Sequence, residues 1–202
     1  MIEVTSYESV GKGRYRTTFD TGMTCVLYRG EAVRFSIKEG AFISEEQMEQ
    51  LLKEVVGKRA KKRALHLLEQ MDRSERKLRE KLAQNEYPQC CIDEAIDYVK
   101  SFHYLDDFRF ASTYVRYHQT SLGRQQLTQK LMTKGIARDD INMAIEQEYT
   151  ADEDEHILKL LNKKNYDPQN CDEKEFRRIY QYLLRRGFKS GQILKLMKQN
   201  SF

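Results

Sequence analysis

The sequence predicts a mainly α-helical protein: three tandem three-helix repeats, each with a helix-turn-helix outline, in an elongated array that follows a small N-terminal antiparallel β-sheet. Two observations lead to this prediction. Five apolar positions separated by steps of 4, 5, 5 and 4 residues occur three times, in copies 49 and 52 residues apart. The first 43 residues instead carry alternating, β-prone runs separated by turn residues. A period of about 50 residues indicates an array of one supersecondary unit.

Residues 1–43 are expected to form a small sheet of three or four strands. The candidate strands are Ile2–Thr5, Arg14–Phe19, Thr24–Tyr28 and Ala32–Ile37, the last two joined by a hairpin turn at residues 29–31. Such a sheet is marginally stable alone and should pack on a helix. Its edge could also pair with a strand of a partner.

Residues 44–57 are expected to form a connecting helix. Ser44 and Gln47 make a capping box at its start, and Gly57 ends or bends it. The next six residues, Lys58–Arg63, hold five basic side chains around Ala60. At the start of a new helix these cations would oppose the helix dipole, which favours a ligand-facing role. If the run continues the preceding helix, this conflict disappears.

The repeats are expected at residues 58–104, 105–149 and 150–202. In each repeat, steps of four residues keep apolar side chains on one helix face, and the central steps of five break that face. The break carries Gly135 or Gly187 after a basic residue, a pattern typical of a helix C-terminus, whereas the first repeat has Asn85 or Glu86 there. The repeated apolar positions are Leu78, Leu82, Tyr87, Ile92 and Ile96; Leu127, Leu131, Ile136, Ile141 and Ile145; and Ile179, Leu183, Phe188, Ile193 and Met197.

The charge of the chain is unevenly distributed. The first and third repeats each have 11 Lys and Arg against 8 Asp and Glu, and therefore carry +3, whereas the middle repeat has 6 of each and is neutral. This distribution favours a weak, salt-sensitive attraction to polyanions. The alternative is that these Lys and Arg side chains only keep a helical surface soluble.

Residue patterns that carry catalysis or bind metals are absent from the sequence. The four cysteines lack C-x-x-C spacing, the four histidines are scattered, and no phosphate-binding glycine loop or hydrolase motif occurs. The sequence has no run of 18 apolar residues and no signal-peptide pattern. We therefore expect a cytoplasmic protein with free thiols that uses no cofactor or metal, is not an enzyme, and acts by binding.

The order and spacing of the repeat residues resemble those of the RecX family, the bacterial regulators of the recombinase RecA. The resemblance covers residues 45–200 well and the β region loosely, and the Asn85-Glu86 turn departs from the glycine that the family usually has. The matching residues are Arg73, Ser74, Leu78, Leu82, Ile92, Ile96, Tyr104, Leu105, Asp106, Asp107, Phe110, Ala111, Gly123, Leu127, Leu131, Gly135, Ile136, Ile141, Ala144, Tyr182, Leu183, Gly187, Phe188 and Ile193.

The resemblance implies a non-enzymatic partner of RecA. RecX-like proteins bind in the groove of the RecA–DNA filament and limit its ATPase, strand exchange and co-protease activity in the SOS response and DNA repair. They also bind single- or double-stranded DNA weakly and without sequence preference. We expect an inhibitor that is a monomer and does not contact membranes.

A helix-turn-helix transcriptional regulator is the alternative. The second helices of the repeats lack the Arg, Asn and Gln clusters expected at base edges, which argues against it. The candidate residues for partner or DNA binding are Lys58, Arg59, Lys61, Lys62, Arg63, Arg73, Arg76, Lys77, Arg79, Arg124, Lys130, Arg177, Arg178, Arg185, Arg186 and Lys189.

Overall fold

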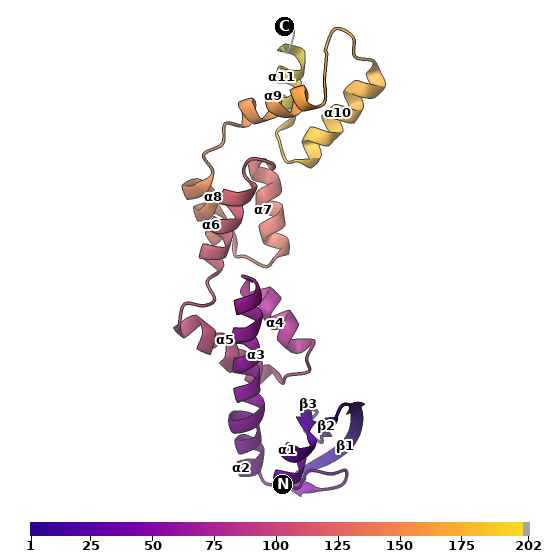
Figure 1. Cartoon of the computed structure of the whole chain (residues 1–202), viewed down its shortest axis with the longest axis vertical. Coiled ribbons are helices and arrows are strands. Elements are labelled where there is room, and N and C mark those ends of the chain that lie inside the picture. The colour runs from indigo at the N-terminus through magenta and orange to yellow at the C-terminus, as the bar shows by residue number, and fades with distance from the viewer. Residues whose placement is uncertain (200–202) are drawn as a thin grey trace. The chain divides into compact units, whose positions relative to one another are not determined.

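The computed structural model describes residues 1–199, so the last three residues of the predicted third repeat lie outside the described part. The chain divides into two compact units, Met1–Asp106 and a second unit that starts at Asp107. The first unit holds the sheet, a long helix and the first three-helix module, and the second unit holds the other two modules (Figure 1). The structure confirms the predicted mainly helical fold with a small N-terminal antiparallel sheet.

Four antiparallel strands form the sheet in the spatial order β3-β2-β1-β4. The side chains of Val4, Phe19 and Leu27 are fully buried, and they belong to the same hydrophobic core as the helices of the first unit. The sheet is therefore stabilised by packing on helices, as expected for a sheet of this size. The strands are β1 (Ile2–Gly11), β2 (Arg14–Phe19), β3 (Thr24–Tyr28) and β4 (Phe42–Ile43).

The prediction of one of the strands is wrong. The sequence predicts a strand over residues 32–37 after a hairpin turn, but the chain instead forms the short helix α1 (Arg29–Arg34). The burial pattern explains the helix, because Ala32 and Phe35 are buried while Val33 between them is 72% exposed. This spacing of three residues matches a helix and not the period of two of a strand. Packing therefore overrides the local β propensity.

A single long helix follows the sheet. It consists of α2 (Glu45–Gln50), a π-helical stretch η1 (Leu51–Val56) and α3 (Gly57–Gln70). Gly57 has a helical φ of −65°, so the helix does not end there and the basic run continues it. The conflict between these cations and a helix N-terminus therefore does not arise. A Cβ on Gly57 would lie 2.8 Å from the Leu52 carbonyl oxygen, which explains glycine at this position.

Three-helix modules make up the rest of the chain. All the repeated apolar positions are buried except Tyr87, which is half-buried. The second and third modules each have a hydrophobic core of their own, whereas the core of the first merges with that of the sheet. The remaining helices are α4 (Glu75–Ala83), α5 (Gln89–Ser101), α6 (Asp107–His118), α7 (Arg124–Thr133), α8 (Arg138–Glu148), α9 (Glu153–Lys163), α10 (Glu173–Arg185) and α11 (Ser190–Gln199).

The turn inside each module uses a residue with positive φ. Gly135 and Gly187 have φ values of 87° and 84°, and Glu86 takes this role in the first module with a φ of 59°. A left-handed conformation is unfavourable for Glu, but its carboxylate accepts two hydrogen bonds from Arg16 on β2, at 2.5 and 2.7 Å. The sheet thereby holds the turn of the first module in place.

Candidate partner-binding surface

The basic run at the start of α3 includes side chains that stabilise the fold. Arg59 donates a hydrogen bond from Nη2 to the Val26 carbonyl oxygen at 2.6 Å, and its Nη1 lies 3.3 Å from the Glu31 carboxylate. Its guanidinium group also lies over the Tyr28 ring, 4.9 Å from the centroid. Arg59 therefore joins α3 to β3 and α1, and Arg63 is half-buried as well.

Other cations of the same run face solvent. The Nζ of Lys61 lies 3.0 Å from the Glu94 carboxylate and 5.9 Å from the centroid of the Tyr98 ring, so its charge is partly neutralised. Lys58 and Lys62 are exposed and have no partner among residues 1–199. These two are the cations of the run that remain available to a ligand.

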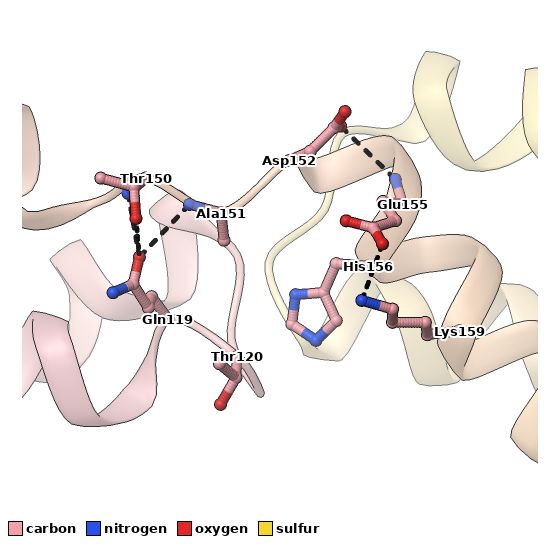
Figure 2. Close-up of a pocket in the computed structure, with 8 residues that line it drawn as sticks. All are labelled: Gln119, Thr120, Thr150, Ala151, Asp152, Glu155, His156 and Lys159. Atoms are coloured by element: carbon pink, nitrogen blue, oxygen red, sulfur yellow. Dashed lines mark hydrogen bonds and ion pairs between the residues drawn. The ribbon is translucent and has the colours of Figure 1, made fainter.

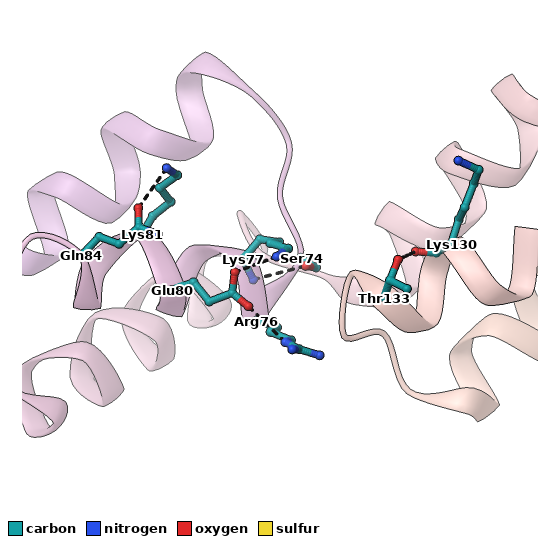
Figure 3. A network of polar contacts seen from close by, with 8 residues as sticks. All are labelled: Ser74, Arg76, Lys77, Glu80, Lys81, Gln84, Lys130 and Thr133. Carbon is teal, nitrogen blue, oxygen red and sulfur yellow. Dashed lines mark hydrogen bonds and ion pairs between the residues drawn. The ribbon is translucent and has the colours of Figure 1, made fainter.

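Helix α4 carries basic residues that share carboxylates. Arg76 Nε and Lys77 Nζ lie 3.1 and 2.7 Å from the two carboxylate oxygens of Glu80. Figure 3 shows both side chains directed toward this carboxylate. The hydrogen bond from Lys77, with the charge of Arg76, lowers the pKa of the Glu80 carboxyl. Arg73 donates a hydrogen bond from Nε to the Leu67 carbonyl oxygen at 3.3 Å. The net positive charge of this face is consequently smaller than the number of its basic residues suggests.

Arg79 connects α4 to α5. Its Nε lies 2.7 Å from the Glu75 carboxylate, its Nη1 lies 2.5 Å from the Asp93 carboxylate, and Lys100 also pairs with Glu75. Burial by itself raises the pKa of Glu75, but the hydrogen bonds from Lys100 and Arg79 outweigh it and lower the pKa. This network holds two helices together, so Arg79 acts mainly within the fold.

In the second module, too, one predicted basic residue makes contacts within the fold and the other has an unpaired charged group. The guanidinium group of Arg124 lies over the Tyr149 ring at 4.4 Å, and Nη2 donates a hydrogen bond to the Tyr149 carbonyl oxygen at 3.4 Å. Lys130 is half-buried, and its ammonium group has no partner within the described chain. Its backbone carbonyl accepts a hydrogen bond from Thr133 (Figure 3).

Helix α10 presents exposed cations of the third module. Arg177 and Arg178 pair with Glu173 and Glu175 at 2.6 and 3.0 Å, and all four side chains are exposed. Pairs of this kind contribute about 0–1 kcal/mol and exchange readily for other partners. Further exposed cations, which have no partner in the part of the chain that the structure describes, are Arg185 and Lys189.

Arg186 belongs to a tight junction between the second and third modules. Its Nη1 donates a hydrogen bond to the Ser121 carbonyl oxygen at 2.7 Å, and its own carbonyl oxygen accepts one from the Gly123 N–H at 2.8 Å. A Cβ on Gly187 would lie 2.4 Å from the backbone nitrogen of Gln126. The turn of the third module therefore packs against the first turn of α7, and Arg186 stabilises this contact.

A cavity of about 280 Å³ lies beside this junction (Figure 2). His156 is buried in its wall with its ring edge against Phe188, at 5.1 Å between centroids, and neither ring nitrogen reaches a hydrogen-bond partner among the described residues. Burial and the nearby cations Arg186 and Lys159 lower the pKa of His156, so the imidazole is neutral near pH 7. The lining residues are Gln119, Thr120, Thr150, Ala151, Asp152, Glu155, His156 and Lys159.

The structure thus separates the predicted basic residues into two groups. Arg59, Arg79, Arg124 and Arg186 make contacts that hold elements of the fold together, and sequence analysis could not tell them from ligand-facing residues because both kinds lie at similar helical positions. The accessible cations lie on α3 and α4 and in the third module, and on α7 the half-buried Lys130 has no partner among the described residues. Three exposed aromatic residues at and just beyond the end of α5, Tyr98, Phe102 and Tyr104, were not among the predicted binding residues, because the apolar pattern does not separate exposed rings from core positions.

The structure describes no group of three or more His, Cys, Asp or Glu side chains that could hold a metal ion among residues 1–199. Burial raises the pKa of the Cys25 and Cys91 thiols to about 12, so neither is a thiolate near pH 7. Within the described chain, no helix is both long and apolar enough to cross a membrane.

Three family matches cover most of the helical part of the chain. Residues 60–98 match the first three-helix domain of RecX, residues 106–145 match the second, and residues 152–197 match the third. The three domains occur in the same order as the repeats of the sequence.

Individual proteins show the same similarity. The regulatory protein RecX of Clostridioides difficile (strain 630) is 31% identical over 166 residues, which cover 80% of this chain and 77% of that protein. The regulatory protein RecX of Actinobacillus pleuropneumoniae serotype 5b is 35% identical over 136 residues, which cover 66% of this chain and 87% of that protein. A crystal structure of a regulatory protein RecX shares the fold, with a TM-score of 0.61, 22% identity, and coverage of 99% of this chain and 100% of that chain.

Proposed function

The chain belongs to the RecX family, whose members regulate RecA, and from this premise we propose that it inhibits RecA by binding in the groove of the RecA–DNA filament. On this proposal it limits the ATPase, strand exchange and co-protease activity of the filament. It acts by binding as a monomer in the cytoplasm, without a cofactor. The observation that carries the proposal is the succession of three RecX domains, in order, along one chain.

A chain of similar modules suits a filament of repeated subunits. Residues 102–106 join α5 to α6 and residues 149–152 join α8 to α9, so one bound module keeps the next at high local concentration. Contacts that are individually weak then add up to strong binding, provided that the modules can engage together. The proposal therefore does not require a single high-affinity pocket.

The accessible cations support an electrostatic contribution from DNA. Lys58 and Lys62 on α3 and Arg185 and Lys189 in the third module project into solvent. They can contact phosphates without reading bases, which gives weak binding that depends on salt and not on sequence. With a few phosphate contacts, we expect a slope of log K against log salt of about −2 to −5.

The geometry argues against a transcriptional regulator that reads duplex DNA. In a helix-turn-helix protein the second helix enters the major groove with its N-terminal side chains at base edges. Here that position in α8 carries Asp139 and Asp140, and α5 presents Glu94 and Asp97 on its exposed side. Carboxylates at these places would repel the phosphates on either side of the groove.

The proposal is tested by adding the protein to preformed RecA–single-stranded DNA filaments and following ATP hydrolysis and filament length. We expect both to fall. A variant with Lys58, Lys62, Arg185 and Lys189 changed to Glu should inhibit more weakly while keeping its helix content. These side chains are chosen because none has a partner within residues 1–199, so their reversal breaks no described contact.

The matched control reverses four other exposed cations: Lys12, Lys38, Arg138 and Lys163. It changes the net charge equally but leaves Lys58, Lys62, Arg185 and Lys189 in place, and it should inhibit nearly as well as the unmodified protein. Equal losses in the two variants would show that only total charge matters. A protein that leaves ATPase and filament length unchanged would refute the proposed function.

A further inference from the structure

Three aromatic side chains at the end of α5 form an exposed cluster, which we call the aromatic patch. Tyr98, Phe102 and Tyr104 are 37%, 55% and 53% exposed. The ring centroids of Tyr98 and Phe102 lie 5.1 Å apart in an edge-to-face arrangement, and those of Phe102 and Tyr104 lie 6.1 Å apart with an interplanar angle of 25°. Solvent-exposed clusters of aromatic rings are typical of interaction sites, and aromatic residues are enriched in the cores of protein interfaces.

Carboxylates flank this patch on the same face of α5. Glu94, Asp97, Tyr98, Ser101 and Phe102 follow one another at helical spacing, so they share one face. All five residues are exposed, while the opposite face of the helix packs in the core. The exposed face therefore combines apolar rings with two carboxylates, of which Glu94 pairs with Lys61 and Asp97 is unpaired among the described residues.

The patch already accommodates one cation from its own chain. The ammonium group of Lys61 lies 5.9 Å from the Tyr98 centroid and 3.0 Å from the Glu94 carboxylate. Ring faces attract cations through their quadrupole, and an adjacent carboxylate adds to that attraction. A second cation supplied by a partner would find the same kind of environment at the carboxylate of Asp97, which has no partner among the described residues.

We propose that the aromatic patch binds a protein surface that presents Arg or Lys beside apolar side chains, and that in the complex with the filament it contacts a RecA subunit and not DNA. This inference rests on the proposed function. Single-stranded DNA also stacks on exposed aromatic rings, but sites of that kind combine the rings with a positively charged groove. On this face of α5 the unpaired charge beside the rings is the Asp97 carboxylate, so a basic protein surface is the complementary partner.

The test uses the full-length chain with Tyr98 and Phe102 both changed to Ser. The control is Phe42→Ser, because Phe42 is similarly exposed, at 58%, but lies on β4 away from the patch. Each protein is titrated against preformed filaments of RecA on a labelled oligonucleotide and, separately, against the same oligonucleotide without RecA. Far-UV circular dichroism reports whether each variant is folded.

We expect the double variant to bind the filament at least about 10-fold more weakly, as is typical for loss of central aromatic residues, and to bind naked DNA within twofold of the unmodified protein. The control should bind both like the unmodified protein. Unchanged filament affinity in a folded double variant would overturn the proposal. An equal loss of affinity for naked DNA would also overturn it, because the patch would then be a stacking platform for bases.

A second variant, Asp97→Lys, keeps the rings and tests the charge argument if the double variant does not fold. It should weaken filament binding and leave DNA binding unchanged or stronger, and unchanged filament affinity would refute the inference. Failure of the unmodified protein to bind filaments at all would refute the proposed function itself. Normal binding by the unmodified protein and by both folded variants would refute only the role of the patch.

Discussion

Gly187→Ala is predicted to break the junction between the second and third modules. Gly187 has a φ of 84°, a conformation that side chains rarely adopt, and it packs directly on the backbone of α7. An added Cβ would lie 2.4 Å from the Gln126 nitrogen, 2.6 Å from its Cβ and 2.9 Å from its Cα. Two of these atoms belong to a helix backbone, which cannot move aside as a flexible side chain does. The two modules must therefore separate locally.

The free-energy cost of Gly187→Ala is estimated from the backbone strain of Ala and from the hydrogen bonds that break when the two modules separate. The left-handed backbone costs Ala about 1–2 kcal/mol. Separation also breaks the neutral hydrogen bond from the Gly123 N–H to the Arg186 carbonyl and the charged one from Arg186 Nη1 to the Ser121 carbonyl. With about 0.5–1.5 kcal/mol for the first and about 1.5–3 kcal/mol for the second, the junction loses roughly 2–4.5 kcal/mol, and the backbone strain further destabilises the turn itself.

Hydrogen exchange of the Gly123 amide measures this loss directly, because that amide is a donor across the junction. A loss of about 3 kcal/mol corresponds to exchange that is faster by about 100-fold or more. Gly22→Ala is the control, since Gly22 has a φ of 79° but no atom within 4 Å of an added Cβ. It should leave exchange at Gly123 unchanged. Unchanged exchange in Gly187→Ala would show that the modules do not pack as described.

Two further predictions concern stability. Leu131→Ala should lower the free energy of unfolding of the middle module by about 2–5 kcal/mol, measured by urea denaturation, because Leu131 is fully buried in its core; a loss below 1 kcal/mol would contradict that burial. The hydrogen bond from Arg16 lowers the pKa of Glu86 from its ordinary value of 4.5. The contribution of this carboxylate to the free energy of unfolding is therefore complete above pH 4.5, and it disappears as the pH falls through the lower pKa of the folded protein. Arg16→Gln should flatten the loss of stability below pH 4.5, and an unchanged pH profile would count against a role for this ion pair.

The repeat could be predicted in detail because burial follows the apolar period of a helix. Fourteen of the fifteen repeated positions are buried, and the exception, Tyr87, is half-buried. The capping box at Ser44 could be predicted equally well, because it depends on two residues only three positions apart. In the structure the Gln47 N–H donates to Ser44 Oγ at 3.1 Å, and the Ser44 N–H donates to Gln47 Oε1 at 2.9 Å. Such patterns are local, so they need no knowledge of distant segments.

The candidate site was less predictable, because a basic side chain is free to bind a ligand only if no residue from a distant segment pairs with it. Arg59 and Lys62 lie three residues apart in one basic run, but only Arg59 meets strand β3, 33 residues away along the chain. Likewise, helix α1 replaces an expected strand because its neighbours bury Ala32 and Phe35 together. Local propensity could not reveal either outcome.

By itself, the sequence determined the number of modules, their order, their core residues and the family to which the chain belongs, because these depend on spacing along the chain. Only the tertiary structure decided that Glu86 could replace a turn glycine, since Arg16 reaches it from the sheet. It also decided which cations remain free and placed the aromatic patch among carboxylates. These properties depend on side chains that approach across elements, and a linear spacing does not specify them.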